Sequence, residues 1–169
     1  IGPGLLPDTR TKNLVKRLLQ NHRDKKILLD AGALRAIDPS WLHQNCIITP
    51  HKQEFKSLFN QKSSMQAAKK ISLTCPATII LKGSTDYVCR DGRVFSNATG
   101  NVGLTKGGTG DVLAGLLAGL LTKNDIELAS QAAIFINGKA GDRLYKKFKQ
   151  YYSASELISE VQGILGGNV

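Results

Sequence analysis

The segment Gly107-Gly108-Thr109-Gly110-Asp111 combines residue types that can bind and transfer a phosphoryl group. It leads directly into the apolar stretch Val112–Leu121, which is typical of a buried helix. The first N–H groups of a helix have no internal partner and lie at the positive end of the helix dipole. Glycines let the backbone approach a ligand closely. The segment therefore predicts an anion-binding turn suited to phosphate.

Asp111 is the one carboxylate in this turn. A carboxylate beside a phosphate site repels the substrate unless it has a task, and removing a proton from an attacking hydroxyl is such a task. The neighbouring N–H groups would then stabilise the charge on the transferred group. The alternative is a simple helix cap. The segment is not a Walker A loop, since Gly-Lys-Ser/Thr does not follow it. It is not a Rossmann fingerprint either, since no Gly-x-Gly-x-x-Gly opens the first strand–helix turn.

The elements that must position this turn alternate between helix and strand. Three short apolar runs, Lys26–Asp30, Cys46–Thr49 and Ala77–Leu81, predict strands buried on both faces. Asp91-Gly92 lies between two further β-like runs and predicts a hairpin. Helices are expected at Lys12–Gln20, around Phe55–Phe59, and at Ser64–Leu73, Thr109–Thr122, Asp125–Phe148 and Ser153–Leu165.

This order predicts a single α/β domain over residues 1–169, with three αβα layers. The central sheet is expected to be mainly parallel, with helices on both faces. In such sheets ligands bind beyond the carboxyl ends of the strands. One cleft should therefore be faced by the segments that follow the strands: Gly2–Leu5, Asp30–Gly32, Thr49–His51, Lys82–Asp86 and Asn97–Asp111.

Composition excludes several other classes of protein. The 169 residues suffice for one domain with a real core, and no apolar stretch reaches the roughly 20 residues of a membrane span. Cys46, Cys75 and Cys89 are odd in number and widely spaced, which argues against a disulfide framework and a zinc site. We expect reduced thiols in a cytoplasmic protein, two of them in the core.

The net charge of +10 raises the possibility of nucleic-acid binding. Residues 10–26 contribute +6 and residues 139–149 contribute +4, so the rest of the chain balances to zero. Neither stretch carries an interleaved aromatic stacking motif. We interpret both as solvated helix faces, and expect no nucleic-acid or membrane partner.

Asn101–Gly115 closely resembles the signature of the ADP- or ATP-dependent NAD(P)H-hydrate dehydratases, a carbohydrate-kinase-related branch of the ribokinase-like superfamily. Gly-Thr-Gly-Asp alone would point only to the superfamily. The resemblance extends in order along the chain through Ile1–Leu5, Leu29–Leu34, Ile48–Phe55, Leu81–Asp86 and Phe135–Asp142.

The resemblance implies repair of NADH or NADPH hydrated on the nicotinamide ring (NADHX and NADPHX). A nucleotide phosphorylates the unwanted hydroxyl, and phosphate then leaves by elimination. The donor is ADP or ATP, with the local pattern nearer to the ADP-using forms, and phosphoryl transfer implies Mg²⁺ although no dedicated metal cage is visible.

The same resemblance assigns roles to individual residues. Asp111 would contact the hydrated substrate and activate its hydroxyl, and Gly4 and His51 match positions for the dinucleotide. The nucleotide would be held by Lys82, Gly83, Ser84, Thr85, Asp86, Asn101, Gly107, Gly108, Thr109 and Gly110.

Other interpretations stand beside several of these assignments. His51 could cap the next helix, and Lys82 could be an ordinary exposed lysine. Asp30 is interpreted as the cap of the turn before Leu34 and left outside the site. Glu54 could contact the dinucleotide or be solvated. His22 and His43 have polar neighbours and are expected at the surface.

The family's domain is normally longer at its N-terminus, where a further segment contacts the substrate. Here the motifs begin at Ile1, so we expect the larger, C-terminal part of the domain. An open sheet edge would favour association, and we expect a homo-oligomer. Two alternatives remain open: a ribokinase-like kinase of sugars or vitamin precursors, and a nonenzymatic nucleotide sensor or nucleic-acid-binding module.

Overall fold

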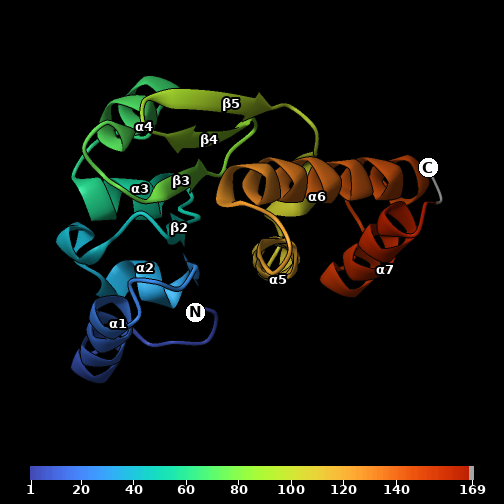
Figure 1. Cartoon of the computed structure of the whole chain (residues 1–169). Helices are drawn as coiled ribbons and strands as arrows, with labels where there is room; N and C mark the ends of the chain where they lie inside the picture. Colours follow the sequence, from blue (N-terminus) through green and yellow to red (C-terminus); the bar gives the residue numbers. More distant parts are fainter. Residues whose placement is uncertain (168–169) are drawn as a thin grey trace. The chain divides into compact units, whose positions relative to one another are not determined.

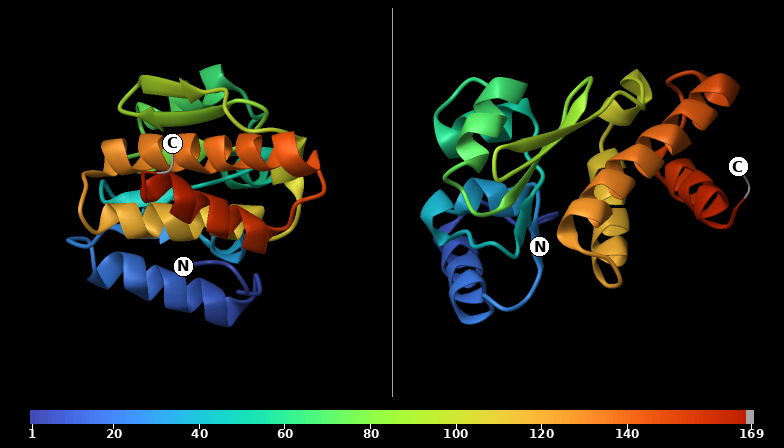
Figure 2. Two further views of the ribbon diagram at one scale, coloured as in Figure 1. Left: turned by 90° about the vertical axis from the view of Figure 1, so that its right-hand side faces the viewer. Right: turned by 45° about the horizontal axis from the view of Figure 1, so that its top comes forward.

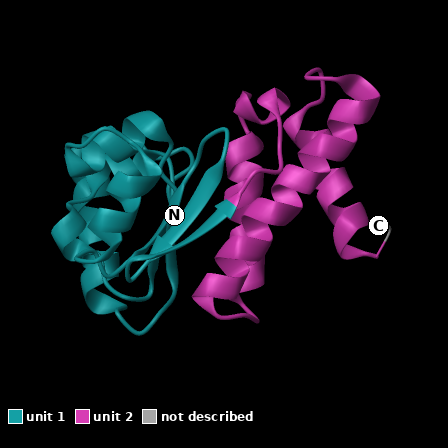
Figure 3. Cartoon of the chain, turned by 90° about the horizontal axis from the view of Figure 1, so that it is seen from above, with its two compact units in different colours: residues 1–96 teal, residues 97–169 magenta. Residues whose placement is uncertain are grey.

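The computed structural model describes residues 1–167, and the chain forms two compact units, Ile1–Ser96 and Asn97–Val169 (Figure 3). The single domain expected over residues 1–169 stays a prediction.

The first unit is organised by a five-stranded sheet in the order β1-β2-β3-β4-β5 (Figure 1). Strands β1 (Ile27–Leu29), β2 (Cys46–Ile48) and β3 (Thr78–Leu81) are parallel, and β4 (Asp86–Arg90) runs antiparallel to β3. β5 (Arg93–Asn97) completes the expected hairpin. Asp91 and Gly92 have φ of 48° and 73°, as a two-residue turn with two left-handed positions requires. The sheet is therefore mixed. Its parallel part, β1 to β3, contains the strands whose carboxyl ends were predicted to face a ligand.

Helices of the first unit cover one face of this sheet (Figure 2, right). They are α1 (Thr9–Asn21), α2 (Gly32–Ala36), η1 (Pro39–Trp41), α3 (Lys52–Phe59) and α4 (Met65–Ser72). Val15, Leu19 and Phe55 pack with side chains from alternate strand positions in one apolar core. Leu14 of α1 is 49% exposed and lies outside this core.

His43 is also buried, at 3% exposure, and the expectation of a surface position is wrong. It lies in the turn before β2, where its Nδ1 accepts a hydrogen bond from the Asn45 N–H at 3.3 Å. Burial lowers the pKa of His43, and the charge of Arg23 lowers it further. Polar neighbours in the sequence did not reveal this burial, because the turn folds inward beside Leu42 and Cys46 of the core.

The second unit is helical in its described part. It contains η2 (Val102–Thr105), α5 (Thr109–Leu121), α6 (Ile126–Phe148) and α7 (Ala154–Leu165), all three α-helices close to the expected bounds. α6 packs against both α5 and α7. Ala140, Leu144, Tyr152, Leu157 and Val161 form an apolar cluster in this unit.

Cys46 and Cys89 are fully buried, as expected, and all three cysteines are free thiols. Among the described residues, no helix combines the length and apolar character that crossing a membrane requires.

Candidate functional site

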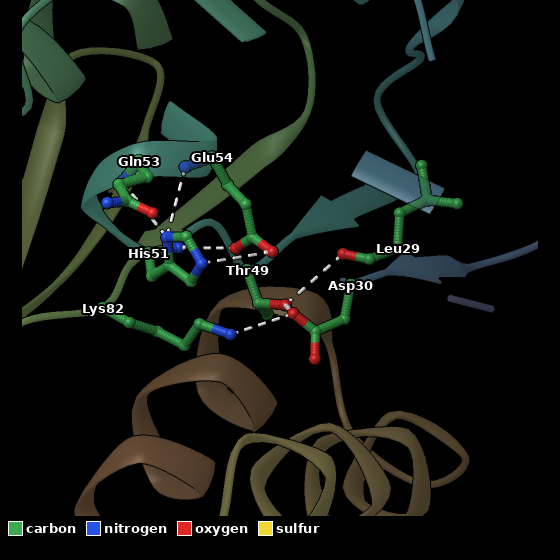
Figure 4. Close-up of polar contacts among 7 residues, drawn as sticks. All are labelled: Leu29, Asp30, Thr49, His51, Gln53, Glu54 and Lys82. Atoms are coloured by element: carbon green, nitrogen blue, oxygen red, sulfur yellow. Dashed lines mark hydrogen bonds and ion pairs between the residues drawn. The ribbon is translucent and has the colours of Figure 1, made fainter. Parts of the chain in front are cut away.

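Three side chains meet where neighbouring parallel strands of the first unit end (Figure 4). Asp30 follows β1, Thr49 follows β2 and Lys82 follows β3. Asp30 Oδ1 accepts a hydrogen bond from Thr49 Oγ1 at 2.7 Å and lies 2.9 Å from Lys82 Nζ. We refer to Asp30, Thr49 and Lys82 as the strand-end cluster.

The sheet register brings these residues together. Leu29 pairs with Ile48, so β1 and β2 end level, and Ile48 pairs with Ile79, so β3 ends two residues beyond them at the same edge. The Lys82 N–H donates to the Pro50 carbonyl at 2.9 Å, and this bond continues the parallel pairing beyond β3. The cluster is therefore fixed by backbone pairing as well as by its own side chains.

Lys82 lies at the carboxyl ends of the strands, where the sequence predicted a ligand. Its side chain is only 20% exposed, so the alternative of an ordinary exposed lysine is wrong. Asp30 was left outside the site, yet it is 3% exposed and holds this lysine. A signal was present in the sequence, since an Asp directly after a buried parallel strand lies at the ligand edge of the sheet.

His51 caps helix α3, as one interpretation of the sequence predicted. Its Nδ1 accepts from the N–H groups of Gln53 and Glu54 at 3.1 and 3.2 Å, so the ring proton lies on Nε2. Glu54 completes a capping box by accepting from the His51 N–H at 2.9 Å. Glu54 is 7% exposed, so the alternative of a solvated position is wrong. The His51 side chain is 44% exposed, and its contact with the dinucleotide stays a prediction.

Gly4 belongs to a turn next to the strand-end cluster. Ile1 runs beside β1, because its amino group donates to the Leu28 carbonyl and its carbonyl accepts from the Asp30 N–H. The chain then turns, and Leu5 N–H donates to Gly2 at 3.0 Å. Gly4 has φ of 81° and open space where a Cβ would stand. Its position leaves room for a ligand against the backbone.

The loop from Lys82 to Asp86 joins β3 to β4. Asp86 Oδ1 accepts a hydrogen bond from the Gly83 N–H at 3.0 Å and so closes the loop on itself. This bond gives Asp86 a role in loop shape, while Ser84 and Thr85 lie between the two bonded residues.

In the second unit, the Gly-rich turn opens helix α5 as predicted. Gly108 is the N-cap residue, with φ of 88°, so Asp111 is the third residue of the helix and not its cap. The Asp111 side chain is exposed and has no hydrogen-bond or ionic partner in the described part of the chain. The N–H groups of Gly110 and Asp111 likewise have no acceptor there. The turn thus presents two free donors and one free carboxylate.

Thr109 and Asn101 hold the loop that precedes this helix. Thr109 is 3% exposed, and its hydroxyl lies 2.6 Å from the Leu104 carbonyl and 2.8 Å from that of Lys106. Asn101 Oδ1 accepts from the Gly103 N–H at 2.9 Å and from Tyr152 Oη at 3.0 Å. Both side chains are used inside the protein, so any contact with a nucleotide would come from their backbone or a change of partner.

An apolar groove of about 450 Å³ lies between helices α5 and α7, and Asp111 is at its edge. It is lined by Gly108, Val112, Gly115, Leu116, Ala154, Ser155, Ile158, Val161 and Gln162 as well. Within residues 1–167 there is no cluster of three or more side chains that could hold a metal ion. The prediction that residues 97–111 share one cleft with the strand ends stays a prediction.

Comparison with known proteins places these features in a family context. The model of a family described as NAD(P)H-hydrate dehydratase matches residues 1–163. The ADP-dependent (S)-NAD(P)H-hydrate dehydratase of Nitrosopumilus maritimus is 38% identical over 175 residues, covering 98% of this chain and 60% of that protein.

Solved structures give the same result. A ribokinase-like superfamily protein from Enterococcus faecalis matches with a TM-score of 0.86 and 25% identity, covering 98% of this chain and 61% of that one. The ADP/ATP-dependent NAD(P)H-hydrate dehydratase from Bacillus subtilis, co-crystallised with ATP and Mg²⁺, matches with a TM-score of 0.82 and 26% identity, covering 98% and 64%. The expected three-layer, ribokinase-like α/β fold class is confirmed. The chain spans between 32% and 60% of the length of the first curated relatives that it matches.

Proposed function

Because the chain belongs to the NAD(P)H-hydrate dehydratase family, we propose that it is the nucleotide-binding part of an enzyme that repairs hydrated NADH and NADPH. The observation that carries this proposal is the start of helix α5. There a free carboxylate, Asp111, stands beside two free N–H donors in a turn built from glycines. A positioned base next to an anion site is what phosphoryl transfer to a hydroxyl requires.

The proposed reaction has two steps. The oxygen of the substrate hydroxyl attacks the terminal phosphorus of the nucleotide while Asp111 accepts the hydroxyl proton. The nucleotide then leaves with one phosphate fewer. The C–O bond of the resulting phosphate ester then breaks, phosphate takes the electron pair, and a proton leaves the neighbouring carbon. Phosphorylation is useful because hydroxide is a poor leaving group and phosphate a good one.

The nucleotide is proposed to bind through the Lys82–Asp86 loop and the Asn101 and Gly107–Gly110 segments, with ADP as the preferred donor and ATP as the alternative. Gly108 supports this role through its left-handed backbone, which turns the chain so that the next N–H groups point out of the helix. Lys82 supports it by placing an ammonium at the strand ends. Gly4 and His51 are proposed to contact the dinucleotide.

Mg²⁺ fits this site only together with the nucleotide phosphates. The described residues offer no three-ligand cluster, and Mg²⁺ is usually bound by one or two carboxylates plus phosphate oxygens. Asp111 is the carboxylate within the anion-binding turn. When bound, the ion would neutralise phosphate charge.

The test uses the full-length protein, purified NADHX and either ADP or ATP. We expect the absorbance of reduced nicotinamide to recover while orthophosphate appears in equal amount. Recovery with neither nucleotide would refute the repair proposal. A phosphorylated product with no free orthophosphate would instead indicate a small-molecule kinase. Size-exclusion chromatography with light scattering tests the proposed homo-oligomer, and fractionation of the source cells tests the proposed cytoplasmic location.

A further inference from the structure

The strand-end cluster contains a carboxylate that the proposed chemistry does not use. Asp30 is 3% exposed and Thr49 is 1% exposed, so neither is a surface residue. A buried carboxylate is costly unless it is paired and hydrogen-bonded. Asp30 has both kinds of partner, and both bonds end on the same oxygen, Oδ1. This one atom connects the ends of three neighbouring strands.

Lys82 depends on this arrangement for its position. A lysine side chain has a flexible stem of four carbons and loses considerable rotamer freedom when it is held in one place. Its main-chain N–H is fixed to Pro50, while its Nζ is fixed 2.9 Å from Asp30. An ammonium group has three donors, and the ion pair with Oδ1 engages one direction only. The remaining directions can serve a ligand.

Thr49 fixes the carboxylate in turn. Its Oγ1 lies 2.7 Å from Asp30 Oδ1 and 3.4 Å from the Leu29 carbonyl, so its single proton goes to the shorter contact. Figure 4 shows Lys82 and Thr49 approaching the same side of Asp30. The carboxylate cannot rotate away from the lysine without losing the threonine bond.

We propose that Asp30, held by Thr49, is a positioning residue that keeps the Lys82 ammonium directed at the phosphates of the nucleotide. The inference rests on the proposed function, because it takes the ligand of Lys82 to be a nucleotide. Two effects of Asp30 oppose each other. Its charge weakens the attraction of the site for phosphate, while its bond removes the entropy cost of ordering the lysine. Positioning of the lysine is the larger of the two effects.

The first experiment measures the ADP dissociation constant of the full-length protein for Asp30→Asn, Lys82→Met and the double variant. Loss of a hydrogen bond to a charged group corresponds to roughly a tenfold or greater weakening, which we expect for each single variant. Because Asp30 acts through Lys82, adding Asp30→Asn to Lys82→Met should change the constant by less than about twofold. Asp30→Glu should recover part of the affinity. Asp24→Asn, which removes an exposed carboxylate that pairs with Lys25, is the matched control.

The outcomes separate this inference from the function on which it rests. Unchanged or tighter ADP binding by Asp30→Asn would overturn the positioning role, since charge repulsion would then be the larger effect. Independent, multiplicative losses in the double variant would overturn it as well, because a purely structural role predicts them. If the wild type binds ADP but does not repair NADHX, the proposed function fails while the positioning role is still tested by binding. A wild type that binds neither ADP nor ATP overturns both.

Thermal unfolding of the same variants tests whether loss of the folded state, and not loss of lysine positioning, explains weaker ADP binding. Asp30→Asn leaves a mostly buried lysine without its ionic partner and is expected to lower Tm. Binding is therefore measured well below the Tm of the least stable variant. Thr49→Val, which keeps the shape of the side chain, should weaken ADP binding less than Asp30→Asn does, because Thr49 acts on Lys82 only through Asp30. A larger effect of Thr49→Val would contradict this sequence of contacts.

Discussion

The hydroxyl of Tyr152 donates a hydrogen bond to Asn101 Oδ1 at 3.0 Å across 51 residues of sequence. Tyr152 is 1% exposed, and its ring lies where a Cβ on Gly103 would stand, 2.5 Å from the nearest ring carbon. Burial raises the pKa of Tyr152, so the hydroxyl keeps its proton for this bond at neutral pH. The segment just before α7 thereby supports the loop that leads to the anion-binding turn.

Removing this hydroxyl should loosen that loop. Tyr152→Phe deletes one hydrogen bond, and we expect a loss of about 1 kcal/mol in the free energy of unfolding. Urea denaturation of the full-length protein measures it. Tyr151→Phe is the control, since Tyr151 is 78% exposed, and equal losses in both variants would contradict the supporting role of Tyr152.

The left-handed backbone conformation at position 108 requires glycine. Gly108→Ala places a Cβ at φ of 88° and 3.0 Å from the Ala154 Cβ, so we expect destabilisation by about 1 kcal/mol or more and weaker nucleotide binding. Gly107→Ala is the matched comparison for stability, because nothing lies within 4 Å of its Cβ and its φ is not in the left-handed region. Thermal melts that rank Gly107→Ala as the more damaging change would refute this explanation.

Asp111 is predicted to matter for turnover and little for folding. It is exposed and without a partner among the described residues, so Asp111→Asn should leave Tm within about 1 °C, as expected for surface substitutions of small energetic effect. If it is the base, the rate of NADHX repair should fall by about 10²- to 10⁴-fold while ADP binding persists. Stopped-flow turnover and equilibrium binding check the two parts. Turnover near the wild-type rate would exclude Asp111 as the base.

Stability at alkaline pH should depend on the buried thiols. Burial raises the pKa of Cys46 and of Cys89 from 9.0 to about 11. In the unfolded chain the thiols ionise first, so unfolding becomes easier as pH rises from 9 to 11, by at most about 1.4 kcal/mol per pH unit for each thiol. Below pH 9 both states keep the proton and this effect vanishes.

Cys46→Ala tests this pH dependence. The variant is less stable below pH 9 because it leaves a cavity, but its stability should fall less steeply than that of the wild type between pH 9 and 11. Lysines and tyrosines titrate in both proteins and cancel in the difference. Parallel curves over this range in guanidinium titrations would show that the Cys46 thiol does not contribute.

The sequence by itself determined the features that depend on local chemistry. The buried strands, the Asp91-Gly92 hairpin and helix α5 with its glycine entry follow from apolar runs, left-handed turn residues and helix-start rules, each acting within a few neighbouring residues. The family was recognisable for the same reason, since its motifs are continuous stretches.

Only the tertiary structure decided how residues distant in sequence are used. Asp30 and Lys82 are 52 residues apart, and their ion pair exists because neighbouring parallel strands of one sheet end close together at the same edge. His43 is buried, although its sequence neighbours suggested solvent. Burial and pairing depend on which surfaces the chain brings together, and a linear pattern of polar and apolar residues does not contain that information.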